Sequence, residues 1–151
     1  MNIEKLKRRK GSENNTKLSK AYLQIEGLIG ALNKRELKEK HIKAINIDIA
    51  LLNKYDGSDK ELIKQLKKAY NRILEYIEKE LELVAKHHYQ NKWMVFGMIG
   101  GVILSYLFKA IEYSATWNSI GFAISMGLIF GLLAGKNRDE KARKDGNQLE
   151  Y

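Results

Sequence analysis

The pattern of hydrophobic and polar positions divides the chain near residue 92. Before this point, apolar residues recur every three or four positions between charged residues, which is the spacing of amphipathic helices. From Trp93 to Gly135 the chain is instead almost continuously apolar, with one Lys and one Glu. In an ordinary soluble domain, apolar residues recur in stripes along the whole sequence. Their concentration in one part of this chain argues against an ordinary soluble domain.

The apolar part contains two runs, 93–111 and 117–135, and each predicts a membrane-spanning helix. A helix of this length extends roughly 28 Å at ~1.5 Å per residue, close to the ~30 Å hydrocarbon thickness of a bilayer. Because the link between the runs is short, we expect an antiparallel transmembrane hairpin over 93–135. The alternative is a pair of buried core helices in a soluble protein, but so short a chain has difficulty enclosing helices that are apolar on every side.

Aromatic and basic residues flank both runs, as they do at membrane interfaces. The predicted interface anchors are Lys86, Tyr89, Lys92, Trp93, Lys109, Trp117, Lys136 and Arg138. Most cations lie on the side of the two termini, so the positive-inside rule predicts that both termini are cytoplasmic. Met1–Lys10 is basic but no apolar segment follows it, so no signal peptide is visible.

Small residues recur every four positions in both runs, and the pattern is typical of close helix–helix packing in lipid. The predicted helix-packing residues are Gly97, Gly101, Ser105, Gly121, Ala123, Gly127, Gly131 and Gly135. Glycine is also simply common in membrane helices, which is the alternative explanation. The pattern leaves open whether such a glycine zipper joins the two helices of one hairpin or joins different subunits.

Three amphipathic helices are predicted within residues 16–92. Thr16 is expected to cap the first, Asn33 with Glu36 to open the second, and Ser58 with Glu61 to form a capping box on the third. No Pro or Gly follows Ser58 before the apolar part, so we expect the third helix to continue into the membrane as one rod. Such a rod is either a stalk or a transmitter of displacement, and a kink near His87 and His88 is the alternative to full continuity.

The predicted organisation is therefore all-α, with a cytoplasmic helical bundle on a long helix that is continuous with the hairpin. Residues 1–15 are expected to form a basic mobile arm, residues 16–92 the helical domain and stalk, and residues 136–151 a charged cytoplasmic tail. The third helix carries a near-heptad stripe, which suits either packing within the bundle or a coiled coil between subunits. A homo-oligomer would enlarge an otherwise marginal core.

The sequence lacks the residues of a catalytic or metal centre. With no Cys there are no disulfides, thiolate zinc sites or thiol nucleophiles. His87 and His88 are adjacent and not four residues apart, so they cannot share a metal on one helix face, and His41 stands alone. The glycines of 97–101 are not followed by the Lys-Ser/Thr pair of a phosphate-binding loop. We expect no enzymatic activity, no metal and no cofactor.

The net charge of the chain is +9, and nearly all of the excess lies before residue 93. Anionic lipid headgroups account for this charge, because each cation near a membrane surface gains ~1 kcal/mol. Nucleic acid is the less favoured partner, since the cations are mostly Lys and are not interleaved with aromatic residues. The predicted partners are therefore the bilayer with its anionic headgroups, further copies of the chain and a cytoplasmic protein.

Three segments carry a resemblance to a known family: 55–62 (YDGSDKEL), 83–93 (LVAKHHYQNKW), and the glycines up to Gly135 with 139–146 (DEKARKDG). In these segments the chain resembles an uncharacterised family of small bacterial two-span membrane proteins with a glycine-zipper hairpin. The resemblance covers roughly residues 33–149 and implies the architecture of a small bacterial membrane protein. The family differs in having more glycine in its hairpin and often a proline where this chain has Ala85. The resemblance implies no activity and no functional residues.

Taken together, the sequence favours a non-enzymatic, multi-pass inner membrane protein. The main hypothesis is an oligomeric membrane anchor or adaptor whose cytoplasmic helices bind a protein partner. The alternative is a pore-forming, holin-like protein, because two spans with cytoplasmic ends and a basic tail also describe that class. The polar residues of the hairpin are few and lie mostly near one end, which favours the adaptor.

Overall fold

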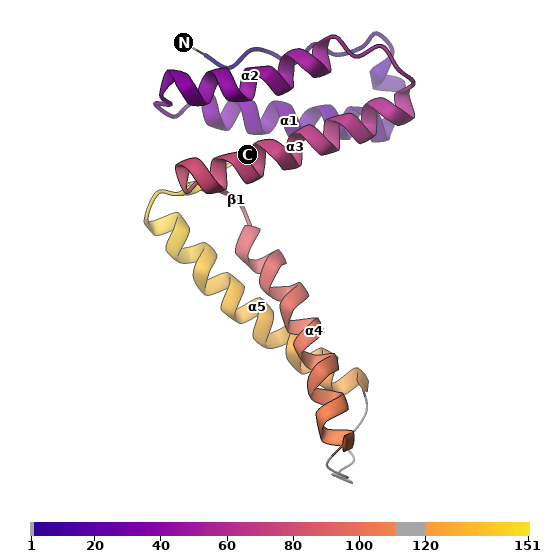
Figure 1. Cartoon of the computed structure of the whole chain (residues 1–151), viewed down its shortest axis with the longest axis vertical. Helices are drawn as coiled ribbons and strands as arrows, with labels where there is room; N and C mark the ends of the chain where they lie inside the picture. The colour runs from indigo at the N-terminus through magenta and orange to yellow at the C-terminus, as the bar shows by residue number, and fades with distance from the viewer. Residues whose placement is uncertain (1, 111–119) are drawn as a thin grey trace. The chain divides into compact units, whose positions relative to one another are not determined.

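The computed structural model describes residues 2–110 and 120–151, with the side chains of residues 2–107 and 120–151. Its helices are α1 (Thr16–Asn33), α2 (Glu39–Asn53), α3 (Asp59–Leu81), α4 (His88–Ala110) and α5 (Ile120–Lys144), with a short 3-10 helix, η1 (Ser12–Asn14) (Figure 1). Two short strands, β1 (Val84–Ala85) and β2 (Gln148–Leu149), pair with each other. The predominance of helix confirms the predicted all-α class.

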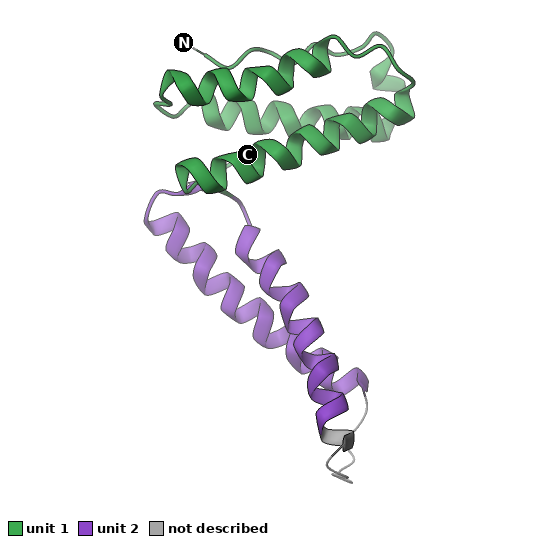
Figure 2. Ribbon diagram, viewed as in Figure 1, with its two compact units in different colours: residues 1–84, 149–151 green, residues 85–148 purple. Residues whose placement is uncertain are grey.

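The chain forms two compact units (Figure 2). Unit 1 contains residues 1–84 and 149–151, and unit 2 contains residues 85–148. Unit 1 is therefore discontinuous in the sequence, with unit 2 inserted between its two parts. The predicted boundary at residue 92 lies eight residues beyond the observed one.

Helices α1, α2 and α3 enclose the hydrophobic core of unit 1. The residues of their apolar stripes are buried, among them Leu18, Ile25, Leu32, Ile45, Ile49, Leu66, Ile73 and Ile77. The near-heptad stripe of α3 thus packs within one chain, and it is not available as a seam between subunits.

The capping box on α3 is confirmed. The Glu61 N–H donates to the Ser58 hydroxyl at 3.4 Å, and the Ser58 N–H donates to the Glu61 carboxylate at 3.2 Å. The hydrogen bonds from Ser58, first of all from its hydroxyl, lower the pKa of Glu61 below its usual range. The two other predicted helix starts are wrong. Asn15 caps α1 in place of Thr16 by accepting from the Leu18 N–H, and α2 begins at Glu39.

The N-terminal segment is part of unit 1 and packs against α1 and α2, so it does not form the predicted mobile arm. Ile3 and Leu6 are buried in the core. Three asparagine side chains accept hydrogen bonds from its backbone: Asn33 from Ile3 at 2.9 Å, Asn46 from Glu4 at 2.9 Å and Asn53 from Lys7 at 2.7 Å. Asn33 is the last residue of α1 and accepts from the N-terminal segment, whereas Lys38 is the residue before α2.

The predicted continuous rod is wrong, because the chain leaves the helical conformation between α3 and α4. The N–H groups of Glu82 and Leu83 both donate to the Ile77 carbonyl and close α3. Glu82 and His87 then adopt left-handed backbone conformations, with φ of 55° and 60°. The break buries the side chains of Leu83 and Val84. The gain from burying two apolar side chains, about 1.5–3 kcal/mol each, offsets the cost of interrupting the helix.

Helices α4 and α5 lie side by side and antiparallel in unit 2 (Figure 1). Among the described residues, α5 is the one helix long and apolar enough to cross a membrane. Of its most apolar stretch of 18 residues, 17% is buried. Helix α5 continues to Lys144, nine residues beyond the predicted end of the second span. Much of the predicted charged tail is therefore helical. The link between the predicted spans, including Glu112, lies outside the described residues.

The last three residues belong to unit 1. Leu149 is 1% exposed and joins the core. The Tyr151 and Tyr70 hydroxyls are hydrogen-bonded at 2.8 Å, and the Tyr151 ring lies against Gly27, where a Cβ atom would come within 3.1 Å of it. Partial burial, assisted by the bond to Tyr70, raises the pKa of Tyr151.

Candidate functional site: the glycine-faced hairpin

The two helices of unit 2 meet at backbone contact along their small residues. A Cβ atom at Gly97 would lie 2.1 Å from the Gly127 carbonyl oxygen, and one at Gly127 would lie equally close to the Gly97 carbonyl oxygen. Atoms cannot approach so closely, so neither position admits a side chain in this packing. Close backbone approach of this kind increases dispersion contacts, which favour helix association in lipid.

Most of the predicted small residues lie on this contact face. A Cβ atom at Gly101 would lie 2.4 Å from the Ala123 carbonyl oxygen, one at Gly131 2.3 Å from the Trp93 carbonyl oxygen, and one at Gly135 2.4 Å from the Gln90 Cα. Gly121 is different, because no atom lies within 4 Å of the position its Cβ would take. Ser105 is half-buried on α4. Of the two alternatives left open by the sequence, the described contacts place the small residues between the helices of one hairpin.

Large apolar side chains face outward along the apolar parts of α4 and α5. Exposed residues on α4 and α5 include Val95, Phe96, Ile99, Ile103, Leu107, Ile120, Ile129, Phe130 and Leu133. Burying a side chain of this size away from water is worth roughly 1.5–3 kcal/mol. The hairpin leaves them uncovered, and such a surface marks a membrane or protein contact.

A carboxylate from α5 caps the beginning of α4. Asp139 is buried, and its two carboxylate oxygens accept from the N–H groups of Tyr89 and Gln90, both at 3.0 Å. The first N–H groups of a helix have no partner within the helix, and their partial positive charge favours an anion. The sequence analysis missed this role because Asp139 is fifty residues from Tyr89 and lies among charged residues of the predicted tail.

The predicted interface residues gather near this end of the hairpin. The Arg138 guanidinium stacks on the Trp93 ring, 4.8 Å from its centroid. Tyr89 is half-buried in the first turn of α4, and Lys86, Lys92 and Lys136 are exposed. Trp117 and the side chain of Lys109, both predicted as anchors, lie outside the described residues.

An apolar groove with a volume of ≈ 600 Å³ runs along one side of the hairpin. Gly97, Gly100, Gly101, Gly127 and Gly131 contribute to its lining, together with larger residues that include Trp93, Phe96, Leu104, Phe122, Met126 and Phe130. Gly100 lines this groove without touching the other helix, since no atom lies within 4 Å of the position its Cβ would take.

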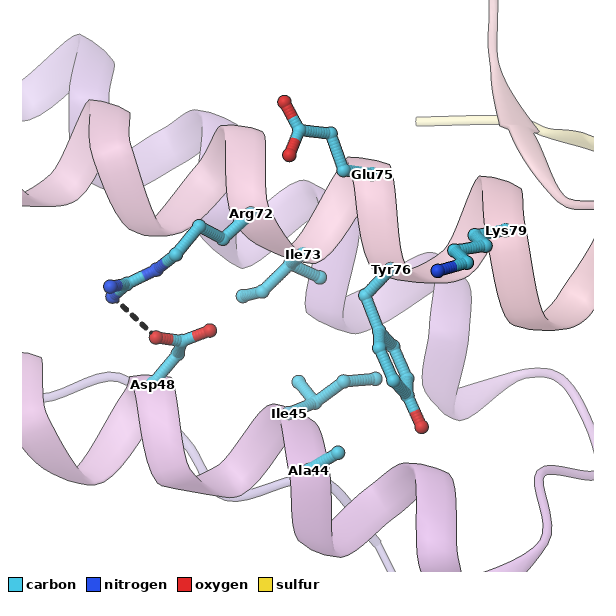
Figure 3. Close-up of a pocket in the computed structure, with 8 residues that line it drawn as sticks. All are labelled: Ala44, Ile45, Asp48, Arg72, Ile73, Glu75, Tyr76 and Lys79. Atoms are coloured by element: carbon cyan, nitrogen blue, oxygen red, sulfur yellow. Dashed lines mark hydrogen bonds and ion pairs between the residues drawn. The ribbon is translucent and has the colours of Figure 1, made fainter.

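Unit 1 has a smaller depression of ≈ 340 Å³ between α2 and α3 (Figure 3). Ile45, Ile73 and the Tyr76 ring supply apolar lining, and an ion pair between Arg72 and Asp48 spans one end. The buried His41 is hydrogen-bonded through Nδ1 to the Tyr76 hydroxyl at 2.9 Å. Burial raises the pKa of Tyr76, with a smaller effect from Glu80.

Within the described ranges 2–110 and 120–151, no group of three or more His, Asp or Glu side chains could hold a metal ion. His41 pairs with Tyr76, and His87 Nδ1 pairs with the Gln90 carboxamide at 2.9 Å. These pairs give the two histidines structural partners.

No protein-family model, curated protein or solved structure matches this chain. The resemblance to two-span glycine-zipper proteins therefore remains a prediction from the sequence. Any functional conclusion has to come from the geometry of the two units.

Proposed function

We propose that the protein is a membrane-anchored adaptor, with the hairpin of unit 2 in the bilayer and unit 1 in the cytoplasm, where it binds a protein partner. The observation that carries the proposal is the reversed distribution of side chains in unit 2. Its helices meet through glycine, and its large apolar side chains face outward. A surface of this kind is stable in hydrocarbon and costly in water.

The discontinuity of unit 1 supports two membrane crossings. Leu83, at the end of the first part of unit 1, and Leu149, at the start of its second part, both belong to the hydrophobic core of unit 1. Because a compact unit lies on one side of a membrane, the chain between these residues has to cross an even number of times. If α5 spans the bilayer, a second crossing is required. Helix α4, with its apolar run from Trp93, is the segment that can provide it.

The charges support a cytoplasmic position for unit 1. Lys86 and Lys92 lie near the start of α4, while Lys136, Arg138 and Lys141 lie in the last part of α5. These cations are all at the ends of the hairpin that connect to unit 1 in the sequence. The positive-inside rule assigns that side to the cytoplasm, which for a bacterial chain means the inner membrane.

The adaptor proposal does not depend on an oligomer. The two features from which self-association was predicted are the glycine faces and the stripe of α3, and both pack within one chain. A homo-oligomer would require other surfaces.

The exposed side of α2 is the surface we propose for the protein partner. Ile47 and Leu51 are 64% and 58% exposed, and they lie one turn apart on the helix that borders the depression of unit 1. Ala44, Ile47, Asp48 and Leu51 follow the i, i+3, i+4, i+7 spacing of one helix face. An amphipathic helix of a partner suits such a surface, because its apolar face can cover Ile47 and Leu51.

Thiol labelling tests the membrane part of the proposal, and the chain lacks native Cys. Single cysteines would replace Asn71 in α3, Lys144 at the end of α5, and Ser114 between the predicted spans. An impermeant maleimide added to intact cells should label the cysteine at 114 alone, and all three after the cells are broken. Labelling of the cysteine at 71 or 144 in intact cells, or recovery of the protein without detergent, would contradict the proposal.

Photocrosslinking tests the partner surface. A photoreactive residue at Leu51 should give one defined crosslinked protein in cells, and Ile47→Asp in the same chain should remove it. The matched control carries the photoreactive residue at Leu23, an exposed leucine on α1. Equal crosslinking from both positions would show that Leu51 does not mark a specific surface.

The holin-like alternative requires a polar path through the membrane. Ser125 is an exposed polar residue on α5, but its hydroxyl donates to the Gly121 carbonyl at 2.8 Å within the helix. The exposed large side chains around it are apolar. Proteoliposomes containing the purified protein should therefore retain a potassium gradient, and rapid leakage would favour the pore.

A further inference from the structure

We propose that the apolar groove of the hairpin binds one acyl chain of an anionic phospholipid from the cytoplasmic leaflet, with the lipid phosphate at Arg138. This inference rests on the proposed membrane location of unit 2. It adds a lipid ligand, and a site for it, to the proposed function.

The length of the groove matches one leaflet. On α4 its lining extends from Trp93 to Leu104, and on α5 from Phe122 to Ala134. These eleven and twelve helical steps correspond to about 16–18 Å. Half of the hydrocarbon core of a bilayer is ~15 Å. Because Trp93 lies at the end of α4 that carries the basic residues, the groove spans the leaflet on the side of unit 1.

The lining of the groove is suited to a hydrocarbon chain. The groove has a volume of ≈ 600 Å³, and apolar side chains and glycines line it. The glycines on the floor expose backbone, and Phe96, Phe122 and Phe130 form apolar walls.

The charge at one end of the groove selects an anionic headgroup. Trp93 lines that end, and the Arg138 guanidinium stacks on its ring at 4.8 Å. Stacking uses the face of the guanidinium, whereas phosphate oxygens bind along its N–H edge. The nearby carboxylate of Asp139 would repel a phosphate. It accepts from the Tyr89 and Gln90 N–H groups, and their partial positive charge offsets part of its negative charge. Basic pockets between membrane helices on the cytoplasmic side are suited to anionic headgroups.

Fluorescence quenching of Trp93 tests the proposal in the full chain. The protein, carrying Trp117→Phe so that Trp93 is the single tryptophan, would be placed in nanodiscs of phosphatidylcholine. Either brominated phosphatidylglycerol or brominated phosphatidylcholine would then be added at increasing fractions. We expect half-maximal quenching at about a fivefold lower fraction of the anionic lipid, in line with the gain of ~1 kcal/mol from one cation.

Two variants separate the chain site from the headgroup site. Gly100→Leu should fill the groove and reduce the selective quenching several-fold, because Gly100 lines the groove and its Cβ would meet no other atom. Gly121→Leu is the control, since its Cβ also meets no atom and Gly121 is not among the lining residues. Arg138→Gln should make the two brominated lipids equally effective as quenchers of Trp93. The fluorescence of each variant is compared with that of the same variant in unbrominated lipid.

Three outcomes would overturn the proposal. The first is equal quenching by the two lipids in the parent protein, and the second is unchanged selectivity in Gly100→Leu. The third is a parent protein that dimerises with increasing concentration in detergent and a Gly100→Leu variant that does not, which would mean that the groove holds a second copy. Failure of the membrane proposal looks different, because neither brominated lipid would then quench Trp93.

Discussion

Units 1 and 2 use the same classes of side chain in opposite places. In unit 1, large aliphatic residues such as Leu66 and Ile73 are fully buried, and charged residues cover the outside. In unit 2, Gly97 and Gly127 lie at the centre of the helix pair, and Ile103 and Phe130 lie outside. Large apolar side chains drive folding only where water surrounds the alternative state. In hydrocarbon they gain nothing from being inside, and close backbone packing takes their place.

The largest expected effect comes from adding a side chain at the centre of unit 2. Gly127→Leu places atoms about where the Gly97 carbonyl oxygen lies, so α4 and α5 have to separate. We expect the association of the two helices to become weaker by at least ~3 kcal/mol, which exceeds the usual cost of overpacking. Denaturation by dodecyl sulfate, followed by energy transfer between dyes on the two helices, measures it. Gly121→Leu should behave like the parent protein, and a matching loss there would contradict the assigned contact face.

Removing a large side chain should have opposite consequences in the two units. Leu66→Ala leaves a cavity in the core of unit 1 and should lower its free energy of unfolding by ~2–5 kcal/mol. Ile103→Ala removes an exposed side chain of unit 2 and should change stability in detergent by less than ~0.5 kcal/mol. Urea titration of the detergent-solubilised protein, followed by circular dichroism, measures the first, and dodecyl sulfate titration the second. A large cost for Ile103→Ala would show that this surface is covered by protein.

Removing the cap of α4 should have an intermediate effect. Asp139→Ala leaves the N–H groups of Tyr89 and Gln90 without their carboxylate and should cost ~1–2 kcal/mol. Faster amide hydrogen exchange at these two residues is the expected signature. Glu140→Ala, on an exposed neighbour, is the control and should leave that exchange unchanged.

The smallest effect concerns the docking of Tyr151 on unit 1. Its pKa is raised in the folded protein, so its contribution is fully present below the unfolded value of about 10 and is lost as pH rises through the folded value. The difference in absorbance at 295 nm between the parent protein and Tyr151→Phe should therefore show one tyrosine that ionises later than an unperturbed tyrosine. If that difference spectrum develops near pH 10, the hydroxyl is not docked against Tyr70.

Features set by neighbouring residues could be predicted from the sequence. The Ser58–Glu61 capping box and the apolar stripes depend on positions three or four residues apart, so the pattern identifies them. Features set by distant residues could not be predicted. Asn33 contacts Ile3 and Asp139 contacts Tyr89, and both residues have ordinary local roles that hide these contacts. The end of α3 could not be predicted because no Pro or Gly marks it. The helix stops there because Leu83 and Val84 become buried.

The discontinuity of unit 1 imposes an order on biosynthesis. Leu149 completes the core, yet it leaves the ribosome only after all of residues 85–148 have been made. The growing chain therefore holds an incomplete domain until α4 and α5 have both been synthesised. If unit 2 lies in the bilayer as proposed, the core of unit 1 can be completed only after both helices have been inserted and the chain has returned to its starting side.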